Sequence, residues 1–322
     1  MFCFCWYVIG AVAGYFLLKW LLRLVKISDY SNKYVFITGC DTGFGHMLAK
    51  RLDGLGFHVF AACFTEKGAD DTKKGASSRL ITISPVDVTK EESIQKALQE
   101  VESKLPTDKG LWAIVNNAGI AGPMGYIDWF TRKHYESVLA VNLFGVIEVT
   151  RIFLPLIRKG KGRVVNIASF LGRIGIPPMP YTISKYGVEA FSDCLRRELY
   201  HQGISVHILE PGYFRTNILD RSTLKDNMRR NFSELPQDLQ EYYGKKYLEN
   251  GIEVIDFVLD KVASPHTHKV VDAYTHAITA RFPKHRYLVG NDIQVFRLVW
   301  NLPEWLSDWL LTLQTATPAG AK

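Results

Sequence analysis

The sequence predicts an α/β protein built on a doubly wound parallel sheet, with a membrane anchor before the sheet and an apolar helical segment after it. Apolar, strand-like runs alternate with helix-like segments over residues 29–216, and these runs are apolar almost throughout. Alternating strands and helices are typical of a parallel sheet that helices cover on both faces. Strands that are buried on both sides read as continuous apolar runs, so the second observation supports the same architecture.

The N-terminal stretch is predicted to be an uncleaved membrane anchor over residues 1–25. The first eighteen residues carry no charged side chain, and Lys19, Arg23 and Lys26 follow among apolar residues. About twenty apolar residues can span a bilayer as a helix. A cleaved signal peptide would have a basic start, a shorter apolar core and a small-residue cleavage site, and none of these is clear here. Because the positive charges follow the apolar run, the positive-inside rule puts the remaining chain on the cytosolic side.

Six strands are expected in the regular part of the chain, at residues 33–39, 58–64, 79–88, 111–119, 162–169 and 205–212. Each is a short apolar run rich in β-branched or aromatic residues, which favours strand structure. Apolar residues recur at helical spacing in residues 46–56, 92–105, 135–159 and 181–200.

The chain after residue 216 is expected to form a substrate lid and an apolar C-terminal segment over residues 217–322. Residues 217–286 are more polar and irregular but keep helical patches, and the stretch from Asn291 onward is apolar with three tryptophans. The apolar tail fits either a core helix or an amphipathic helix in a membrane interface, and the anchor favours membrane contact. Asn231 begins a glycosylation acceptor pattern in the polar part, which we expect to be exposed.

The composition indicates which classes of ligand are not expected. The chain has 322 residues, 47% of them hydrophobic and 22% charged, with a net charge of +7. The basic residues are scattered and no Lys/Arg block is interleaved with aromatics, so nucleic-acid binding is not expected. Five cysteines show no framework or zinc spacing, and the histidines form no metal-ligand spacing, so no metal site is expected.

A glycine-rich loop, TGCDTGFG at residues 38–45, connects the first expected strand to the first expected helix. Its pattern is GxxxGxG, with Gly39, Gly43 and Gly45. The missing side chains let the backbone approach a pyrophosphate, and the helix N-terminus offers free N–H groups there. An ordinary glycine turn is the alternative, but the position after the first strand of a βαβ unit favours dinucleotide binding.

Asp41 within this loop bears on the choice of cofactor. No Arg or Lys follows the second strand until Lys67, whereas a ribose 2′-phosphate would need a cation there. The aspartate would repel that phosphate, so the sequence favours NAD over NADP. Asp41 also suits a turn or a helix N-cap, and the two roles are compatible.

Tyr181 precedes Lys185 by four residues in YTISK, a spacing that places both side chains on one helix face. Such a pair is common on solvated helices. Here it follows NNAG at residues 116–119, which itself follows the glycine loop. The three stretches in this order resemble the short-chain dehydrogenase/reductase family over nearly the whole chain. Together with the N-terminal anchor, TGCDTGFG, DKGLWAIVNNAG, KYGVEAFSDCLRRELY and EPGYFRTN resemble the membrane-associated retinol and hydroxysteroid dehydrogenase branch.

The resemblance implies a Rossmann-type fold and a set of cofactor contacts. Its cofactor positions fall on Gly39, Gly43 and Gly45 at the pyrophosphate, Asp87 at the adenine, Asn116 and Gly119 on the fourth strand, Pro211, Gly212 and Thr216 around the nicotinamide, and Tyr181 and Lys185.

The resemblance also implies a catalytic set. Tyr181 would be the acid/base, Lys185 its partner, Ser169 the catalytic serine, and Asn142 would hold a water in the proton relay. A phenol has a pKa near 10, and a nearby ammonium and a positive nicotinamide would lower it. These residue types fit removal of a hydroxyl proton while hydride leaves for the nicotinamide.

The implied substrate is a lipophilic alcohol, a retinol or a 3α- or 17β-hydroxysteroid, in the endoplasmic reticulum membrane. Pro177, Pro178 and Pro180 depart from the glycine-rich sequence of the branch, and this segment is expected to border the substrate. Two alternatives stay open: an NADPH-dependent carbonyl reductase of the same fold, and a catalytically idle lipid-binding or scaffold protein. The intact catalytic set argues against the idle protein. A homodimer is compatible with the resemblance.

Overall fold

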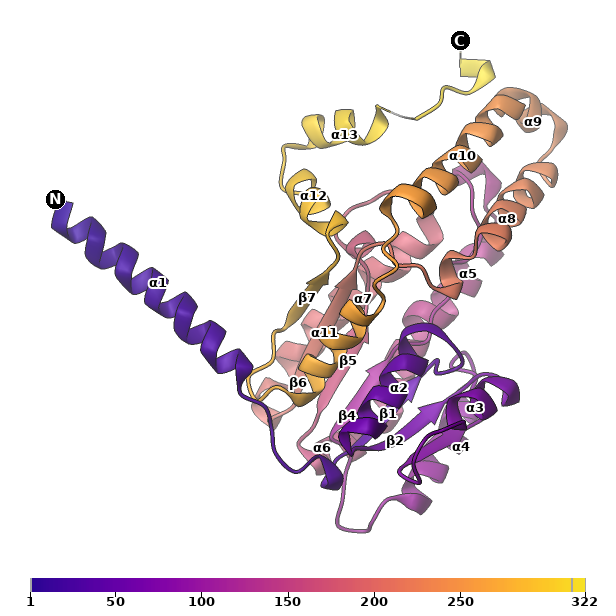
Figure 1. Cartoon of the computed structure of the whole chain (residues 1–322). Helices are drawn as coiled ribbons and strands as arrows, with labels where there is room; N and C mark the ends of the chain where they lie inside the picture. The colour runs from indigo at the N-terminus through magenta and orange to yellow at the C-terminus, as the bar shows by residue number, and fades with distance from the viewer. Residues whose placement is uncertain (1, 314, 322) are drawn as a thin grey trace.

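A computed structural model describes residues 2–313 and 315–321. At its centre is a parallel sheet of seven strands in the order β3-β2-β1-β4-β5-β6-β7 (Figure 1). The strands are β1 (Tyr34–Thr38), β2 (His58–Ala62), β3 (Leu80–Ile83), β4 (Ala113–Asn116), β5 (Arg163–Ile167), β6 (Ser205–Pro211) and β7 (Arg286–Val289). The doubly wound sheet predicted from the sequence is confirmed.

Helices cover both faces of the sheet because side chains along each strand alternate between two cores. In β1, Val35 and Ile37 pack into the core beneath α2 (Gly43–Leu55), α3 (Glu66–Lys73) and α11 (His268–Thr279). Tyr34 and Phe36 face the opposite core, beneath α4 (Glu91–Lys104), α6 (Gly145–Gly160) and α7 (Met179–Glu198). Strand β1 is therefore buried on both sides, which explains its continuous apolar sequence.

The sheet extends past residue 216, where the sequence analysis ended the regular fold. Strand β7 pairs with β6, placing Leu209 opposite Tyr287, and α11 packs on the sheet through Val270 and Tyr274. The expected division at 216/217 is therefore wrong for residues 268–289. Helix α3 was also not predicted from the sequence.

The long helix expected at residues 135–159 is continuous but not uniform. It comprises α5 (Arg132–Leu139), a π-helical segment (Ala140–Phe144) and α6. Among the described residues, Arg132–Gly160 is long and apolar enough to cross a membrane by length and composition, but 44% of its most apolar window is buried. Phe153 and Ile157 pack against the sheet, so this helix belongs to the protein core.

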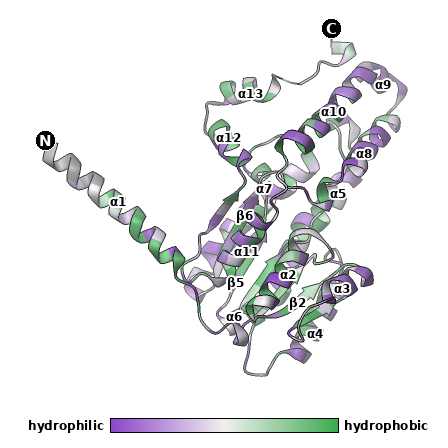
Figure 2. Cartoon of the chain, in the orientation of Figure 1, coloured by the Kyte–Doolittle hydropathy of each residue, from purple (hydrophilic) through white to green (hydrophobic). Residues whose placement is uncertain are grey.

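Helix α1 (Phe2–Leu24) extends away from the body of the molecule (Figure 1). Large apolar side chains on its second half, including Phe16, Leu18 and Trp20, are exposed, and this half is mostly hydrophobic in Figure 2. The chain joins the body directly after the helix, where the Ile27 N–H donates to Thr279 O at 2.7 Å. The helix is thus fixed at one end, with an apolar surface that the described chain leaves uncovered.

The C-terminal part forms a helical cap beyond the carboxyl ends of the strands. It contains α8 (Arg221–Ser233), α9 (Gln237–Tyr243) and α10 (Lys245–Phe257), which share a small core with Trp129. After β7 come α12 (Asp292–Val299) and α13 (Glu304–Thr312). Ile293 of α12 is buried, whereas Trp305 and Trp309 of α13 are exposed, so the tail combines a packed face with an uncovered one.

Asn231 lies in α8 and corrects one expectation. The sequence suggested an exposed glycosylation acceptor, but the side chain is 2% exposed and its amide donates to Met124 O at 2.7 Å. Asn231 is buried although its segment is polar, because this hydrogen bond connects the cap to the loop after β4. Asn231 therefore offers no free surface for a glycan in the folded protein.

Candidate active site

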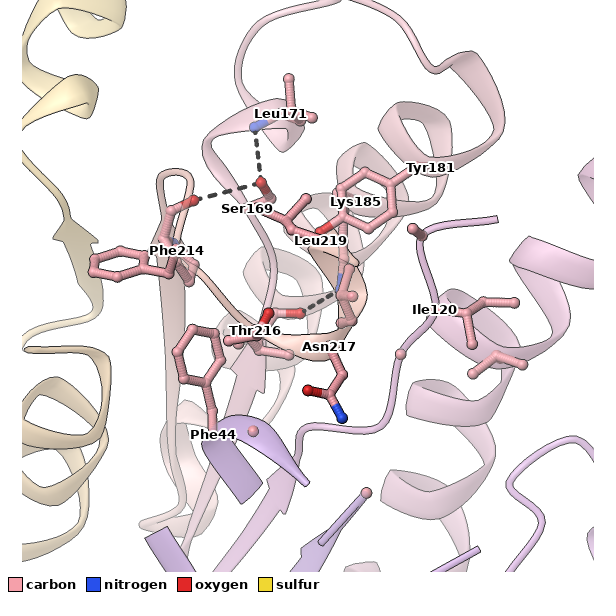
Figure 3. A pocket seen from close by; sticks show the side chains of 18 of the residues that line it. Phe44, Ile120, Ser169, Leu171, Tyr181, Lys185, Phe214, Thr216, Asn217 and Leu219 are labelled. Carbon is pink, nitrogen blue, oxygen red and sulfur yellow. Dashed lines mark hydrogen bonds between the residues drawn. The ribbon is translucent and has the colours of Figure 1, made fainter. Parts of the chain in front are cut away.

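A cavity of about 630 Å³ opens at the carboxyl ends of the parallel strands (Figure 3). Its lining includes Gly39 after β1, Asn117 after β4, Ser169 after β5 and Gly212 after β6. In open parallel sheets, ligands bind in the crevice at these strand ends, where the strand order reverses. Strands β1 and β4 are neighbours in this sheet, and the glycine loop and the NNAG stretch meet there.

The glycine loop has a backbone that larger residues would not fit. Gly39 has φ +68°, and a Cβ on it would come within 2.7 Å of Ala118 Cα. A Cβ on Gly45 would lie 2.5 Å from Asn117 Nδ2. The loop therefore packs tightly against the turn after β4 and leads into the N-terminus of α2. This arrangement suits a pyrophosphate held by helix N–H groups, so the residues present fit a dinucleotide.

The side chain of Asp41 connects the glycine loop to the residues that follow β2. Its carboxylate accepts hydrogen bonds at 2.8 Å from the N–H groups of Phe64 and Thr65 and from the Thr65 hydroxyl. These bonds hold the carboxylate on the cavity wall. Lys185 is the only lysine or arginine among the described residues that line the cavity, so the wall that carries Asp41 has no other such cation.

Asp87 lies on the cavity wall, whereas Asn116, the last residue of β4, does not. Asp87 lines the cavity, and its carboxylate accepts from the N–H and hydroxyl of Thr89 at 3.0 and 2.7 Å. Asn116 does not line the cavity: its amide is buried and donates to Thr150 and Asn166 at 2.8 Å. Asn116 therefore links β4 to α6 and β5 behind the cavity, and its expected support of the cofactor site stays a prediction.

Asn117, the second asparagine of NNAG, lines the cavity, and no role was predicted for it from the sequence. Its amide donates to Thr38 O and Gly39 O, each at 3.0 Å, and its oxygen accepts from the Tyr274 hydroxyl at 3.2 Å. It thus fixes the start of the glycine loop from behind. The doubled asparagine in NNAG was the available signal, and strand alternation decides which of the two faces the loop.

Ser169, Tyr181 and Lys185 meet at the centre of the cavity (Figure 3). Ser169 follows β5, and its hydroxyl accepts from Leu171 N at 3.2 Å and donates to Pro211 O at 3.5 Å. Helix α7 places Tyr181 one turn before Lys185, with the ammonium 5.5 Å from the phenol ring centroid. The ammonium donates to Ile167 O at 3.1 Å, which anchors it to β5.

The protonation of this pair departs from the sequence-based expectation. Burial raises the pKa of Tyr181 to about 12, although the hydrogen bond with Ser169 opposes this. Burial lowers the pKa of Lys185 to about 8, while the charge of Glu189 opposes that change. Within the protein alone, burial therefore prevails over the expected lowering of the Tyr181 pKa.

Asn142 stands behind the cavity rather than on it. It lies in the π-helical segment, is fully buried, and exchanges two 2.9 Å hydrogen bonds with the backbone of Ile120. Its amide also donates to the Ser184 hydroxyl at 3.1 Å. A Cβ on Gly119, which lines the cavity, would lie 3.3 Å from Asn142 Oδ1 and 3.8 Å from Lys185 Nζ. Gly119 therefore leaves room for the asparagine and lysine to approach the same place.

The loop after β6 closes the cavity on its far side through Pro211, Gly212 and Thr216. Asp292, a residue that sequence reasoning missed, holds this loop: its carboxylate accepts from Tyr213 N at 2.8 Å. Asp292 also packs against Gly212, leaving no space for a side chain there. No motif signals this contact, because it joins residues 79 positions apart.

The remaining cavity wall is apolar and comes largely from the cap. Leu224 of α8, Ile255 of α10 and Leu259 after α10 line it. Pro177 and Pro178 also line the cavity, which confirms that the proline segment borders this space. The site therefore joins a polar, glycine-rich end to an apolar end, with Ser169 and Tyr181 between them.

Comparison with known proteins agrees with this geometry. The family model for short chain dehydrogenase matches residues 33–227. The chain is 45% identical to retinol dehydrogenase 7 of Rattus norvegicus and 42% identical to 17-beta-hydroxysteroid dehydrogenase type 6 of Homo sapiens, each over 98% of this chain and 99% of the relative. It is 43% identical to retinol dehydrogenase 16 of Mus musculus, with the same coverage.

Solved structures share the fold. A short-chain dehydrogenase from Streptomyces avermitilis superposes with a TM-score of 0.66 at 24% identity, covering 87% of this chain and 96% of that one. A short chain dehydrogenase/reductase from Burkholderia phymatum, solved in complex with NAD, gives 0.67 at 22% identity and covers 91% and 99%. With the sheet order, the glycine loop and the full-length relatives, the chain belongs to the short-chain dehydrogenase/reductase family and is an oxidoreductase that uses a nicotinamide cofactor.

Proposed function

We propose that the protein oxidises a lipophilic alcohol with NAD, and that the alcohol is a retinol or a 3α- or 17β-hydroxysteroid. The observation that carries the proposal is the single cavity in which Ser169, Tyr181 and Lys185 separate a glycine-rich end from an apolar end. An apolar alcohol can enter from the cap side while its hydroxyl reaches the polar centre. The names of relatives that share 42–45% of the sequence support the two substrate classes.

In this mechanism the chain's own residues orient the alcohol and move its proton. The Ser169 hydroxyl binds the substrate oxygen, and the phenolate form of Tyr181 takes the hydroxyl proton. A bound nicotinamide supplies the hydride acceptor and a positive charge close to the phenol. Lys185 would bind the ribose of the cofactor. Its ammonium lies 5.5 Å from the centroid of the Tyr181 ring. Asn142, next to Lys185 behind Gly119, positions the water through which the proton leaves.

The same residues account for cofactor choice. Gly39, Gly43 and Gly45 would hold the pyrophosphate, Asp87 the adenine, and Gly212 and Thr216 the nicotinamide. The fixed carboxylate of Asp41 would accept a hydrogen bond from a ribose hydroxyl and repel a 2′-phosphate. Preference for NAD over NADP follows from this charge and from the missing cation beside it.

We also propose that α1 anchors the protein in the endoplasmic reticulum membrane with the catalytic body on the cytosolic side. The uncovered apolar side chains of α1 and the basic residues at its end support this orientation. Protease digestion of intact microsomes tests the orientation directly. A cytosolic body is expected to be digested without detergent, and full protection from protease would place it in the lumen.

The catalytic proposal is tested with microsomes from cells that express the full chain. All-trans-retinol and a panel of 3α- and 17β-hydroxysteroids are supplied with either NAD or NADP, and reduced cofactor is measured. We expect substrate-dependent NADH formation with at least one of these alcohols. The matching ketones and aldehydes are supplied with NADPH in parallel, and faster consumption of NADPH than formation of NADH would favour the carbonyl reductase instead.

A further inference from the structure

A second cavity, of about 460 Å³, lies at the open edge of the sheet beside β7 and α12. Its charged lining consists of Arg173, Glu210, Lys284, Arg286 and Arg297. Four of these five groups are cations, so this cavity differs from the active site, where a single lysine is present among mostly apolar walls.

The cations of this cavity are only partly neutralised. Arg286 forms salt bridges with three carboxylates, and Arg173 lies 3.9 Å from Glu210. Within the described part of the chain, Lys284 and Arg297 form no salt bridge with any acidic residue. The cavity therefore has two positive charges without an acidic partner, beside the ion pairs of Arg286 and Arg173. Such an arrangement attracts an anion.

An uncovered apolar surface borders these charges. Gln294, Arg297 and Asn301 recur at spacings of three and four residues and line the cavity, so they form one stripe along α12 and the turn after it. The neighbouring stripe of α12 exposes Val295 and Leu298, at 63% and 71%. Cations beside exposed apolar side chains on one helix are typical of segments that lie in a membrane interface.

Helix α13 in the tail and helix α1 also expose apolar side chains. Trp305 and Trp309 of α13 are 72% and 56% exposed, and tryptophan is enriched at membrane interfaces. Helices α1, α12 and α13 lie along the same side of the molecule in Figure 1. Lys284 is close enough to the end of α1 that burial and the charge of Arg23 lower the pKa of its ammonium.

We propose that the cavity beside β7 binds the phosphate of an anionic membrane phospholipid, with Lys284 and Arg297 as its ligands. The acyl chains would lie against Val295 and Leu298 and reach the tryptophans of α13. A lipid is favoured over a free anion because the two cations border an apolar stripe rather than open polar surface. The inference rests on the proposed membrane association of the chain and adds a specific lipid site to it.

The test measures lipid binding by the purified full chain in dodecylmaltoside micelles. A fluorescent phosphatidic acid is titrated and its anisotropy recorded. We expect the double variant K284E/R297E to weaken binding at least tenfold, since each juxtamembrane cation contributes about 1 kcal/mol to attraction for anionic lipid. The milder R297Q should weaken binding by several fold, and its exposed position leaves folding intact.

The matched control is K96E/K133E, which changes net charge equally at exposed lysines on α4 and α5. Binding by this control should stay within about twofold of wild type. Equal losses in the control and the K284E/R297E variant would overturn the proposal in favour of general charge attraction. Displacement of the lipid by inorganic phosphate at matching concentrations would overturn it in favour of a free-anion site. Alcohol oxidation, measured on the same samples, tests the proposed function separately, because Lys284 and Arg297 do not line the catalytic cavity.

Discussion

At the scale of single residues, Asp41 shows how one side chain serves both the loop and the ligand. Its three hydrogen bonds to Phe64 and Thr65 hold the carboxylate on the cavity wall. A fixed negative charge repels a 2′-phosphate more effectively than a mobile one, because it cannot turn away. The sequence indicated the charge, but the bonds that immobilise it depend on the loop after β2.

Replacing Asp41 by Lys should reverse this discrimination. We expect the ratio of kcat/KM for NADP to that for NAD to rise by more than tenfold, because a repulsive charge becomes an attractive one. Asp70→Lys, at an exposed position of α3, is the matched control and should leave the ratio unchanged. Wild-type enzyme that already uses NADP better than NAD would show that another group receives the phosphate.

The buried acid Glu189 joins helix α7 to the edge strand β7. It bonds Arg286 of β7, which also bonds Glu210 of β6. Burial, followed by the charge of Glu210, raises the pKa of Glu189 well above its ordinary value, although Arg286 opposes the change. The folded protein therefore keeps a proton there that the unfolded chain releases.

Stability should depend on pH through this group. A carboxyl whose folded-state pKa is raised loses its stabilising contribution as pH rises from the unfolded-state pKa through the folded one. Between about pH 5.5 and about pH 8, wild-type Tm should fall by several degrees more than that of E189Q, since 1 kcal/mol corresponds to about 2–4 °C for a domain of this size. E198Q, at the exposed end of α7, is the control and should follow wild type. An equal change of Tm with pH in wild type and E189Q would contradict the raised pKa of Glu189.

Helix α12 should influence cofactor binding through its first residue, Asp292, which holds the loop from Gly212 to Phe214. Asp292→Ala removes the 2.8 Å bond from Tyr213 N and frees the loop that leads to Thr216. We expect the KM for NAD to rise by about tenfold or more, since a hydrogen bond to a charged group contributes about 1.5–3 kcal/mol, with a smaller change in kcat. Asp308→Ala on the exposed face of α13 is the control, and an equal effect of both variants would argue for a general disturbance of the tail.

The elements that the sequence predicted are those with long apolar runs or clear motifs. Six strands have such apolar runs, and the glycine loop has such a motif. Strand β7 was missed because it is a four-residue edge strand that begins with a charged Arg286. Asn117 and Asp292 were missed because their roles depend on contacts with Gly39 and Tyr213, which only the folded chain brings together.

The whole molecule combines a buried catalytic centre with a surface suited to lipid. The cap of α8 to α10 supplies the apolar end of the active-site cavity, while α1, α12 and α13 leave apolar side chains uncovered on one side. Under the membrane anchoring that we propose, a substrate dissolved in the bilayer would meet the protein on the side where these apolar side chains lie.

The central claim is that Tyr181 transfers the proton during alcohol oxidation, and Tyr181→Phe tests it most directly. The variant keeps the ring, so NAD binding measured by fluorescence titration should remain within about twofold, whereas the phenol that takes the proton is gone. General acid–base catalysis contributes roughly 10²–10⁴-fold, so NADH formation in microsomes should fall by at least about a hundredfold. Tyr186→Phe, on an exposed position of the same helix, should retain wild-type turnover. Turnover of Tyr181→Phe within about tenfold of wild type would contradict the account.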